Sequence, residues 1–189
     1  MGFLKRLFGT IEKVNKGEAP IEELDQPFVF DLEEEADDYW RQTEELLLIN
    51  AVKAAGGPDA VERAFVLANF KDDQETFELF YQVNGQLLSW REMDATVVDK
   101  ISNQLLPQAA EVARAVNENY EEADVPVIQY AMLQFETATM AWFGRKLTTA
   151  SPEAQLTFEE LVSGWRAILE QEVPNRPLDS DRPFPYFEV

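Results

Sequence analysis

The chain has 189 residues, of which 36 are acidic and 16 basic, so its formal net charge is −20. It has no cysteine and no histidine, which excludes disulfides, thiolate metal sites and catalysis by serine–histidine or cysteine–histidine pairs. This negative charge disfavours nucleic acid as a ligand, because the phosphates would be repelled, and makes a basic protein the more natural partner.

No segment approaches the roughly 18 uncharged apolar residues of a membrane-spanning helix, and the N-terminus lacks the pattern of a signal peptide. We therefore expect a cytoplasmic protein. The sequence contains no glycine-rich phosphate loop, no HExxH metalloprotease motif and no GxSxG nucleophile motif. We accordingly expect no catalytic residue, no cofactor and no metal ligand.

Residues 1–17 predict a short amphipathic helix that carries Lys5, Arg6, Lys13 and Lys16. One interpretation is a weak contact with a membrane surface through these basic residues. The alternative is docking on the chain's own domain or on a second copy, so a homodimer stays open. Because net charge changes from +3 in residues 1–17 to −11 in residues 18–45, across an acidic linker at 18–27, we expect the helix to be separable from a core domain at 28–173.

An acidic segment opens the core domain with Glu33, Glu34, Glu35, Asp37 and Asp38. These residues lack the ligand spacing and central glycine of an EF-hand calcium loop, whereas carboxylates are favourable at the start of a helix. The segment therefore predicts a helix N-terminus. The apolar spacing continues that helix to residue 55, and the sequence Gly-Gly-Pro at 56–58 ends it.

Residues 76–83 alternate in polarity and end at Asn84-Gly85, the pair typical of a two-residue hairpin turn. This turn predicts three pairs between the strands, namely Val83 with Gln86, Tyr81 with Leu88, and Leu79 with Trp90. It also brings Glu78 to Arg91 on the opposite face. A strand at 63–70 precedes the hairpin and completes a three-stranded meander.

A second helix follows from an N-cap at Asp94 to about Tyr120, and Pro107 is expected to kink it or divide it after Leu106. Two more strands are predicted at 127–135 and 138–147, with their turn near Glu136-Thr137. A capping box at 157–160 starts a third helix. The tail at 174–189 contains four prolines, and we expect its aromatic residues to pin it to the body.

These elements predict an α+β fold in the order α-βββ-α-ββ-α, preceded by the N-terminal helix and followed by an extended tail. The sheet is expected to be single and antiparallel, with about five strands. We expect the helices around 97–116 and 158–169 to cover it mainly on one face.

From about residue 64 to residue 169 the chain resembles the YezG-type family of bacterial toxin-immunity proteins. The resemblance rests on FELFYQVNG, on LQFETATMAWFGRKLT and on Trp165. The element order is also similar to that of type III secretion chaperones and of YbjN-like proteins. All of these are acidic proteins that bind other proteins, so the resemblance implies a binding protein and supplies no catalytic residue.

Charge, composition and resemblance together predict a non-enzymatic, immunity-protein-like module of a bacterial cytoplasm that neutralises or chaperones a basic protein partner. The expected partner-binding residues are Glu33, Glu34, Glu35, Asp37 and Asp38. Two alternatives stay open. The first is a membrane-surface adaptor that acts through residues 1–17. The second is a carboxylate-dependent enzyme, which would hold at least two acids of perturbed ionisation in a concave pocket.

Overall fold

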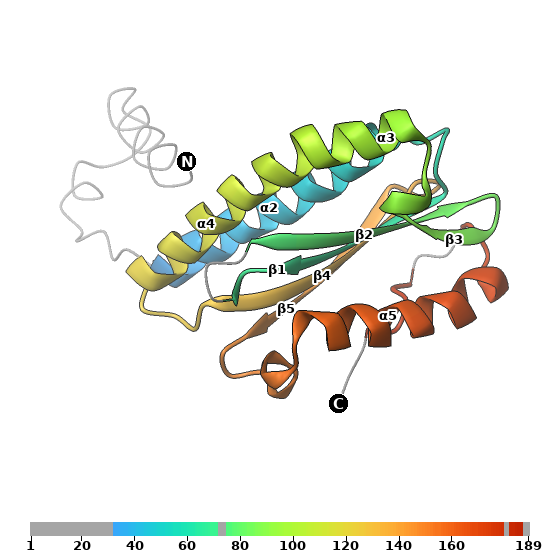
Figure 1. Cartoon of the computed structure of the whole chain (residues 1–189). Helices are drawn as coiled ribbons and strands as arrows, with labels where there is room; N and C mark the ends of the chain where they lie inside the picture. The colour runs from blue at the N-terminus through green and yellow to red at the C-terminus, as the bar shows by residue number, and fades with distance from the viewer. Residues whose placement is uncertain (1–31, 72–74, 180–181, 187–189) are drawn as a thin grey trace, which may run out of the picture.

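The computed structural model describes residues 32–71, 75–179 and 182–186, so the predicted helix at 1–17 and the linker at 18–27 lie outside the described residues. The predicted α+β order is confirmed (Figure 1). The elements are α2 (Leu32–Ala54), β1 (Arg63–Asn69), β2 (Thr76–Val83), β3 (Gln86–Ser89), η3 (Trp90–Glu92), α3 (Ala95–Lys100), η4 (Ile101–Leu105), α4 (Leu106–Glu122), β4 (Ile128–Glu136), β5 (Ala141–Thr148), η5 (Pro152–Gln155), α5 (Phe158–Glu172) and η6 (Val173–Asn175). The strands form one antiparallel sheet in the order β3-β2-β1-β4-β5.

The β2–β3 hairpin has the predicted two-residue turn, in which Asn84 and Gly85 adopt φ values of 50° and 74°. Val83 pairs with Gln86 and Tyr81 with Leu88, as predicted. The predicted pairing of Leu79 with Trp90 is wrong, because β3 ends at Ser89, whose side chain caps η3 and turns the chain away. Arg91 nevertheless reaches Glu78 and forms the expected ion pair.

The long helix is not divided after Leu106, because α4 runs through Leu106 and Pro107 and the backbone stays helical from Ala95 to Glu122. The irregular part is η4, a π-helical segment that lies before Leu106 rather than after it. In this segment the amide of Leu106 donates to the carbonyl of Ile101, five residues earlier. Pro107 has no amide hydrogen for the carbonyl of Asn103, so the regular helical ladder is already interrupted here.

The turn between β4 and β5 lies later than predicted. β4 continues through Glu136, the turn occupies 137–140, and Met140 has a positive φ of 57°. Glu136 stays in the strand because it pairs with Ala141 and its side chain binds Arg63. The hydroxyl of Thr137 donates to the carbonyl of Glu62 at 2.7 Å, which ties the start of the turn to the neighbouring strand.

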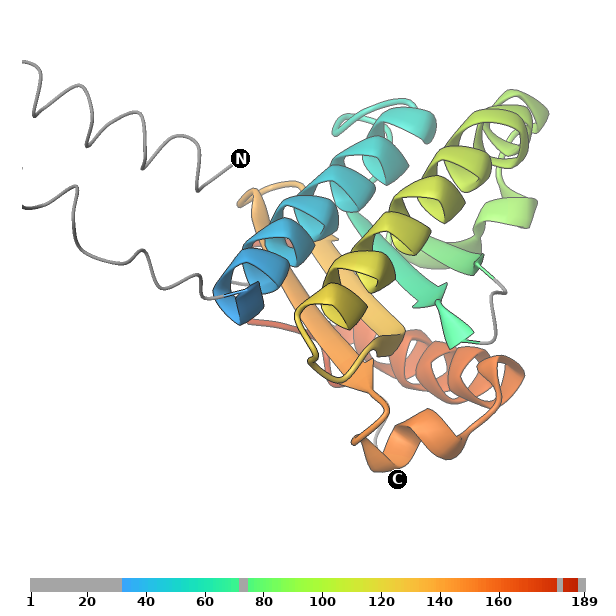
Figure 2. The same cartoon turned by 90° about the vertical axis from the view of Figure 1, so that its left-hand side faces the viewer.

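The helices cover both faces of the sheet, so the prediction that they lie mainly on one face is wrong. α2, α3 and α4 form a helical layer on one face, and α5 lies on the other (Figures 1 and 2). β1 is buried along its whole length, with Ala64, Val66 and Ala68 facing the helical layer and Phe65 and Leu67 facing α5. A strand covered on both faces is apolar throughout, and the run AFVLA at 64–68 has this pattern.

α5 begins at the predicted capping box, in which Thr157 and Glu160 cap each other's backbone groups. The described part of the tail is pinned to this helix, as expected. Phe184 is only 4% exposed and lies edge-on to Phe65, and Tyr186 stacks on Trp165. Among the described residues, no helix is long and apolar enough to cross a membrane.

Candidate functional site

The predicted partner-binding residues lie in the first two turns of α2. Glu33, Glu34 and Glu35 are exposed in the first turn, where their charges are favourable to the helix dipole. Asp38 forms an ion pair with Arg41 one turn along the helix, with 3.0 Å between nitrogen and oxygen. Asp37 points elsewhere, toward α4 and β5.

Asp37 connects three elements of the fold. Its carboxylate accepts hydrogen bonds from the Tyr120 hydroxyl at 2.6 Å and from the Lys146 ammonium group. Lys146 also donates to the Tyr120 hydroxyl at 2.8 Å. Burial tends to raise the pKa of Asp37, but the two hydrogen bonds and the positive charges of Lys146 and Arg41 together outweigh it, and the net pKa is lowered. Asp37 is therefore charged and holds α2 against α4 and β5.

A second group of acids lies at the same end of the helical layer, because α2 begins where α4 ends (Figure 1). These residues are exposed at the C-terminal end of α4 and just beyond it: Glu118, Glu121, Glu122 and Asp124. The last turn of α4 contains no basic residue. Acidic charges are unfavourable at a helix C-terminus, by about 0.3–1 kcal/mol each at the surface. We call the two groups together the acidic end.

Only one of the two groups that form the acidic end, the residues at 33–38, was predicted from the sequence as a binding site. Residues 121–124 contain three acids, but they are more than 80 positions from Glu33 and no local pattern joins the two groups. The pairing of α2 with α4 brings them together. A signal was available only in Tyr120, an aromatic residue with a polar tip at the end of an apolar stripe, which needs a partner when buried.

Glu44 lies two turns behind Asp37 and is nearly buried, with 6% of its surface exposed. Burial raises its pKa from 4.5 to about 7, against the opposing effects of a Trp40 hydrogen bond and of the charges on Lys146 and Arg41. Its carboxylate lies directly on Gly144 of β5, where a methyl group would come within 2.1 Å of Oε1. Glycine at this position therefore leaves the space that the carboxylate occupies.

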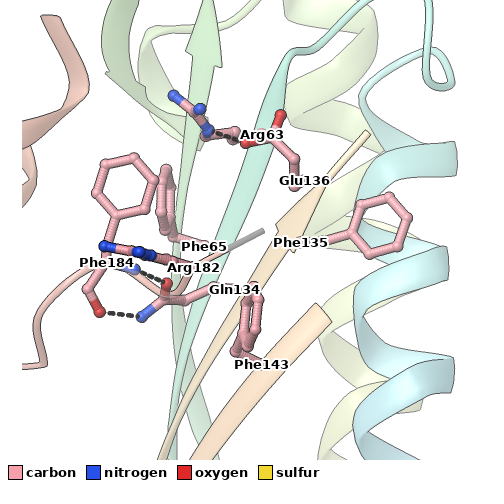
Figure 3. Close-up of a pocket in the computed structure, with 8 residues that line it drawn as sticks. All are labelled: Arg63, Phe65, Gln134, Phe135, Glu136, Phe143, Arg182 and Phe184. Carbon is pink, nitrogen blue, oxygen red and sulfur yellow. Dashed lines mark hydrogen bonds and ion pairs between the residues drawn. The ribbon is translucent and has the colours of Figure 1, made fainter. Parts of the chain in front are cut away.

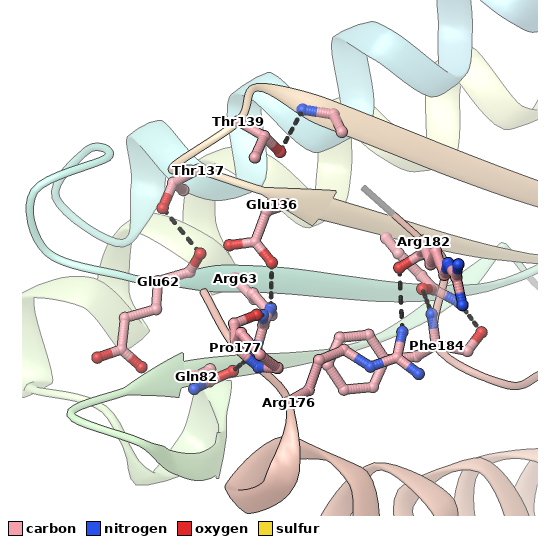
Figure 4. Close-up of polar contacts among 12 residues, drawn as sticks. Glu62, Arg63, Gln82, Glu136, Thr137, Thr139, Arg176, Pro177, Arg182 and Phe184 are labelled. Atoms are coloured by element: carbon pink, nitrogen blue, oxygen red, sulfur yellow. Dashed lines mark hydrogen bonds and ion pairs between the residues drawn. The ribbon is translucent and has the colours of Figure 1, made fainter. Parts of the chain in front are cut away.

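A buried polar cluster occupies the other face of the sheet, around Arg63 at the start of β1 (Figure 4). Arg63 is 1% exposed and donates to Glu136, to the Gln82 side chain at 2.6 Å and to the carbonyl of Pro177. The cluster thus joins three strands to the tail. Beside it, the amide side chain of Gln134 exchanges two hydrogen bonds with the backbone of Phe184, at 3.0 and 2.6 Å (Figure 3).

A cavity of about 10 Å³ lies beside Gln134 and Phe184, close to the room that one water molecule needs. A second hollow, of about 140 Å³, lies on the other side of Glu136 and is also lined by Asp59 and Glu62. Burial raises the pKa of Glu136, although Arg63 opposes the shift. Glu136 and Glu44 are the two described carboxyl groups with raised pKa, and they lie on opposite faces of the sheet. They cannot act as a pair. No group of three or more acids among the described residues is placed to hold a metal ion.

The acidic end is therefore the candidate functional site, because it is the place where the fold concentrates exposed like charge. Its exposed carboxylates suit the binding of cationic groups. Comparison with known proteins adds no identity to this site, since no family model matches the chain and no curated protein is significantly similar to it.

Proposed function

We propose that the chain is a non-enzymatic binding module that holds a basic segment of another protein against the acidic end. The observation that carries this proposal is the meeting of two acidic helix termini, one of which is at a C-terminus where negative charge is unfavourable. The described basic side chains close by are already engaged, since Arg41 binds Asp38 and Lys146 binds Asp37. A cationic partner would relieve the repulsion that remains.

The five residues expected from the sequence contribute unequally in this proposal. Glu33, Glu34 and Glu35 are exposed and meet the partner, together with Glu121 and Glu122 of α4. Asp37 supports the site from behind through Tyr120 and Lys146. Such a surface accelerates association by long-range attraction, which weakens as salt shortens the Debye length. The resemblance to toxin-immunity proteins suggests that the partner is neutralised by binding.

The test is a pull-down from the native cytoplasm at low salt with the full chain as bait. A four-site variant of the acidic end, Glu33→Gln, Glu35→Gln, Glu121→Gln and Glu122→Gln, should lose a stoichiometric basic partner that the wild-type chain retains. A matched variant removes four exposed acids elsewhere: Asp59→Asn, Asp99→Asn, Glu111→Gln and Asp179→Asn. It carries the same net charge and should keep the partner.

Binding should also be lost at about 1 M salt, where the Debye length is about 3 Å. Asp37 stays unchanged in both variants, because its removal would disturb the packing of α2. Equal loss of the partner in the two variants would show that only net charge matters and would contradict a specific site. Retention by the acidic-end variant would do the same.

A further inference from the structure

A hollow of about 290 Å³ lies at the other end of the helical layer, between the last turns of α2 and the segment that runs from α3 to α4. Its walls carry polar side chains from both sides, over an apolar floor at Leu105. The polar side chains are Asn50 and Lys53 of α2, together with Lys100, Gln104 and Gln108. We call it the lysine hollow. Counted along α2, Lys53 is about 24 Å from Asp37, so the hollow is separate from the acidic end.

The charge of this hollow is unusual for the chain. Acidic residues outnumber basic ones by 36 to 16, yet none of the residues that line the hollow is acidic. Nine of the twelve described lysines and arginines form an ion pair or a side-chain hydrogen bond with another described residue, and Arg182 also has a partner. Lys53 and Lys100 are the two whose side chains have no such partner among the described residues, and both line the hollow.

The helix dipole accounts for the position of Lys53 but not for the presence of two lysines in the same hollow. Lys53 is in the last turn of α2, where a positive charge is favourable to the helix dipole. Lys100 comes from a different helix and lines the same space. Two ammonium groups on one small hollow repel each other, and an acidic chain has many carboxylates that could have relieved this repulsion. The other polar side chains that line the hollow are instead the amides of Asn50, Gln104 and Gln108.

The wall that carries Lys100 is shaped by η4. Gln104 and Leu105 belong to this π-helical segment, Lys100 precedes it and Gln108 follows it. A π-helical turn adds a residue to the helix and rotates the side chains on either side of it relative to a regular α-helix. Single π-helical turns are found frequently at functional sites. Here the π-helical turn lies between Lys100 and Gln108 and therefore affects how the two side chains are oriented toward the hollow.

We propose that the lysine hollow binds a small organic or inorganic anion with at least two phosphate or carboxylate groups. The two ammonium groups bind its charges, and the amides of Asn50, Gln104 and Gln108 donate hydrogen bonds to its oxygens. The volume of about 290 Å³ is near the lower limit for small-molecule pockets, so the ligand is a compact metabolite rather than a nucleic acid. This site is independent of the proposed binding of a basic protein.

The test uses the full chain and two probes titrated by calorimetry, pyrophosphate for the phosphate class and citrate for the carboxylate class. We expect saturable one-to-one binding of at least one probe, and the preferred probe identifies the class. Lys53→Gln and Lys100→Gln should each weaken binding about fivefold, and the double variant about twenty-fivefold if the two effects add. Gln108→Ala should weaken binding without any change in charge.

Lys71→Gln is the matched control, because it removes the same charge from a lysine that lies outside the hollow and donates to the Ala154 carbonyl. It should leave the affinity within twofold of the wild type. Melting curves of all variants show whether the fold is retained. Absence of saturable binding of both probes would overturn the proposal. An equal effect of Lys71→Gln would also overturn it, as would unchanged affinity in the double variant.

Discussion

The two faces of the sheet are closed by different means. The helical layer covers one face with α2, α3 and α4 over a large apolar core, and the Glu44 carboxylate is buried beside that core against Gly144. The other face has one long helix, α5, and depends on the tail to complete its core through Phe184. That face also contains the buried Arg63 cluster, which binds Pro177. On the face that has only one long helix, hydrogen bonds from buried polar side chains hold the irregular tail in place.

Among the changes that test this comparison of the two faces, removal of Trp165 should have the largest effect on the free energy of unfolding. Trp165 is fully buried, lies edge-on to Phe65 at 6.0 Å and donates a hydrogen bond to the carbonyl of Pro185. Trp165→Ala should lower the free energy of unfolding by about 3–5 kcal/mol, measured by chemical denaturation. It should also release the tail, which limited proteolysis after residue 173 would detect.

Trp40→Ala is the matched change on the helical face, where Trp40 is 4% exposed and contacts Phe70 edge-on. It should cost a similar free energy but leave the tail resistant to proteolysis. If both variants released the tail equally, the two cores would not be separable and the comparison of the faces would fail.

The Arg63 cluster should show the next largest effect. Arg63→Met removes one partner of a buried ion pair and leaves the Glu136 carboxylate uncompensated, so it should cost about 3 kcal/mol. The double variant Arg63→Met with Glu136→Leu removes both charges and should recover part of that loss. Thermal unfolding of the three proteins measures the difference. A double variant that is less stable than Arg63→Met would show that the charges themselves stabilise this face.

Glu44 gives the smallest expected effect, on the helical face. Its pKa is raised to about 7 in the folded chain, from 4.5 without burial, so the folded state favours the protonated form. Stability from this group is fully present below about pH 4.5 and is lost as pH rises through about 7. The wild type should therefore lose about 2 kcal/mol relative to Glu44→Gln across this window.

The control for this pH effect is Glu136, whose pKa is also raised. It is present in both proteins, so its contribution cancels in the difference between the wild type and Glu44→Gln. Denaturation curves at several pH values measure that difference. If the difference in free energy of unfolding between the two proteins stayed constant from pH 4 to pH 8, the pKa of Glu44 would not be raised by its burial beside Gly144.

The parts of the fold that depend on local chemistry were predictable. Asn84-Gly85 set the hairpin register, Pro107 marked the place where the long helix becomes irregular, and Thr157 marked the start of α5. Each of these signals lies within a few residues of its effect. The side of the sheet that α5 covers was not predictable in this way, because it depends on how the chain crosses the sheet after β5.

The candidate sites were harder to predict from the sequence, because they join residues that are far apart along the chain. The Arg63 cluster joins residues up to 114 positions apart, and nothing near Arg63 in the sequence indicates its partners. The lysine hollow joins Lys53 to Lys100, which come from different helices. Only the acidic run at 33–38 could be named in advance, since all of its members lie in one segment.

The dependence of the α5 face on the tail has a consequence for synthesis on the ribosome. The sheet is complete once residue 148 has emerged, whereas the core under α5 also needs Phe184, about 36 residues later. At about 5–20 residues per second, this interval lasts roughly 2–7 s. During it, the nascent chain exposes Phe65, Leu67 and Met132 on a finished sheet, so a ribosome that stalls between residues 150 and 170 presents an aggregation-prone surface to the cell's folding factors.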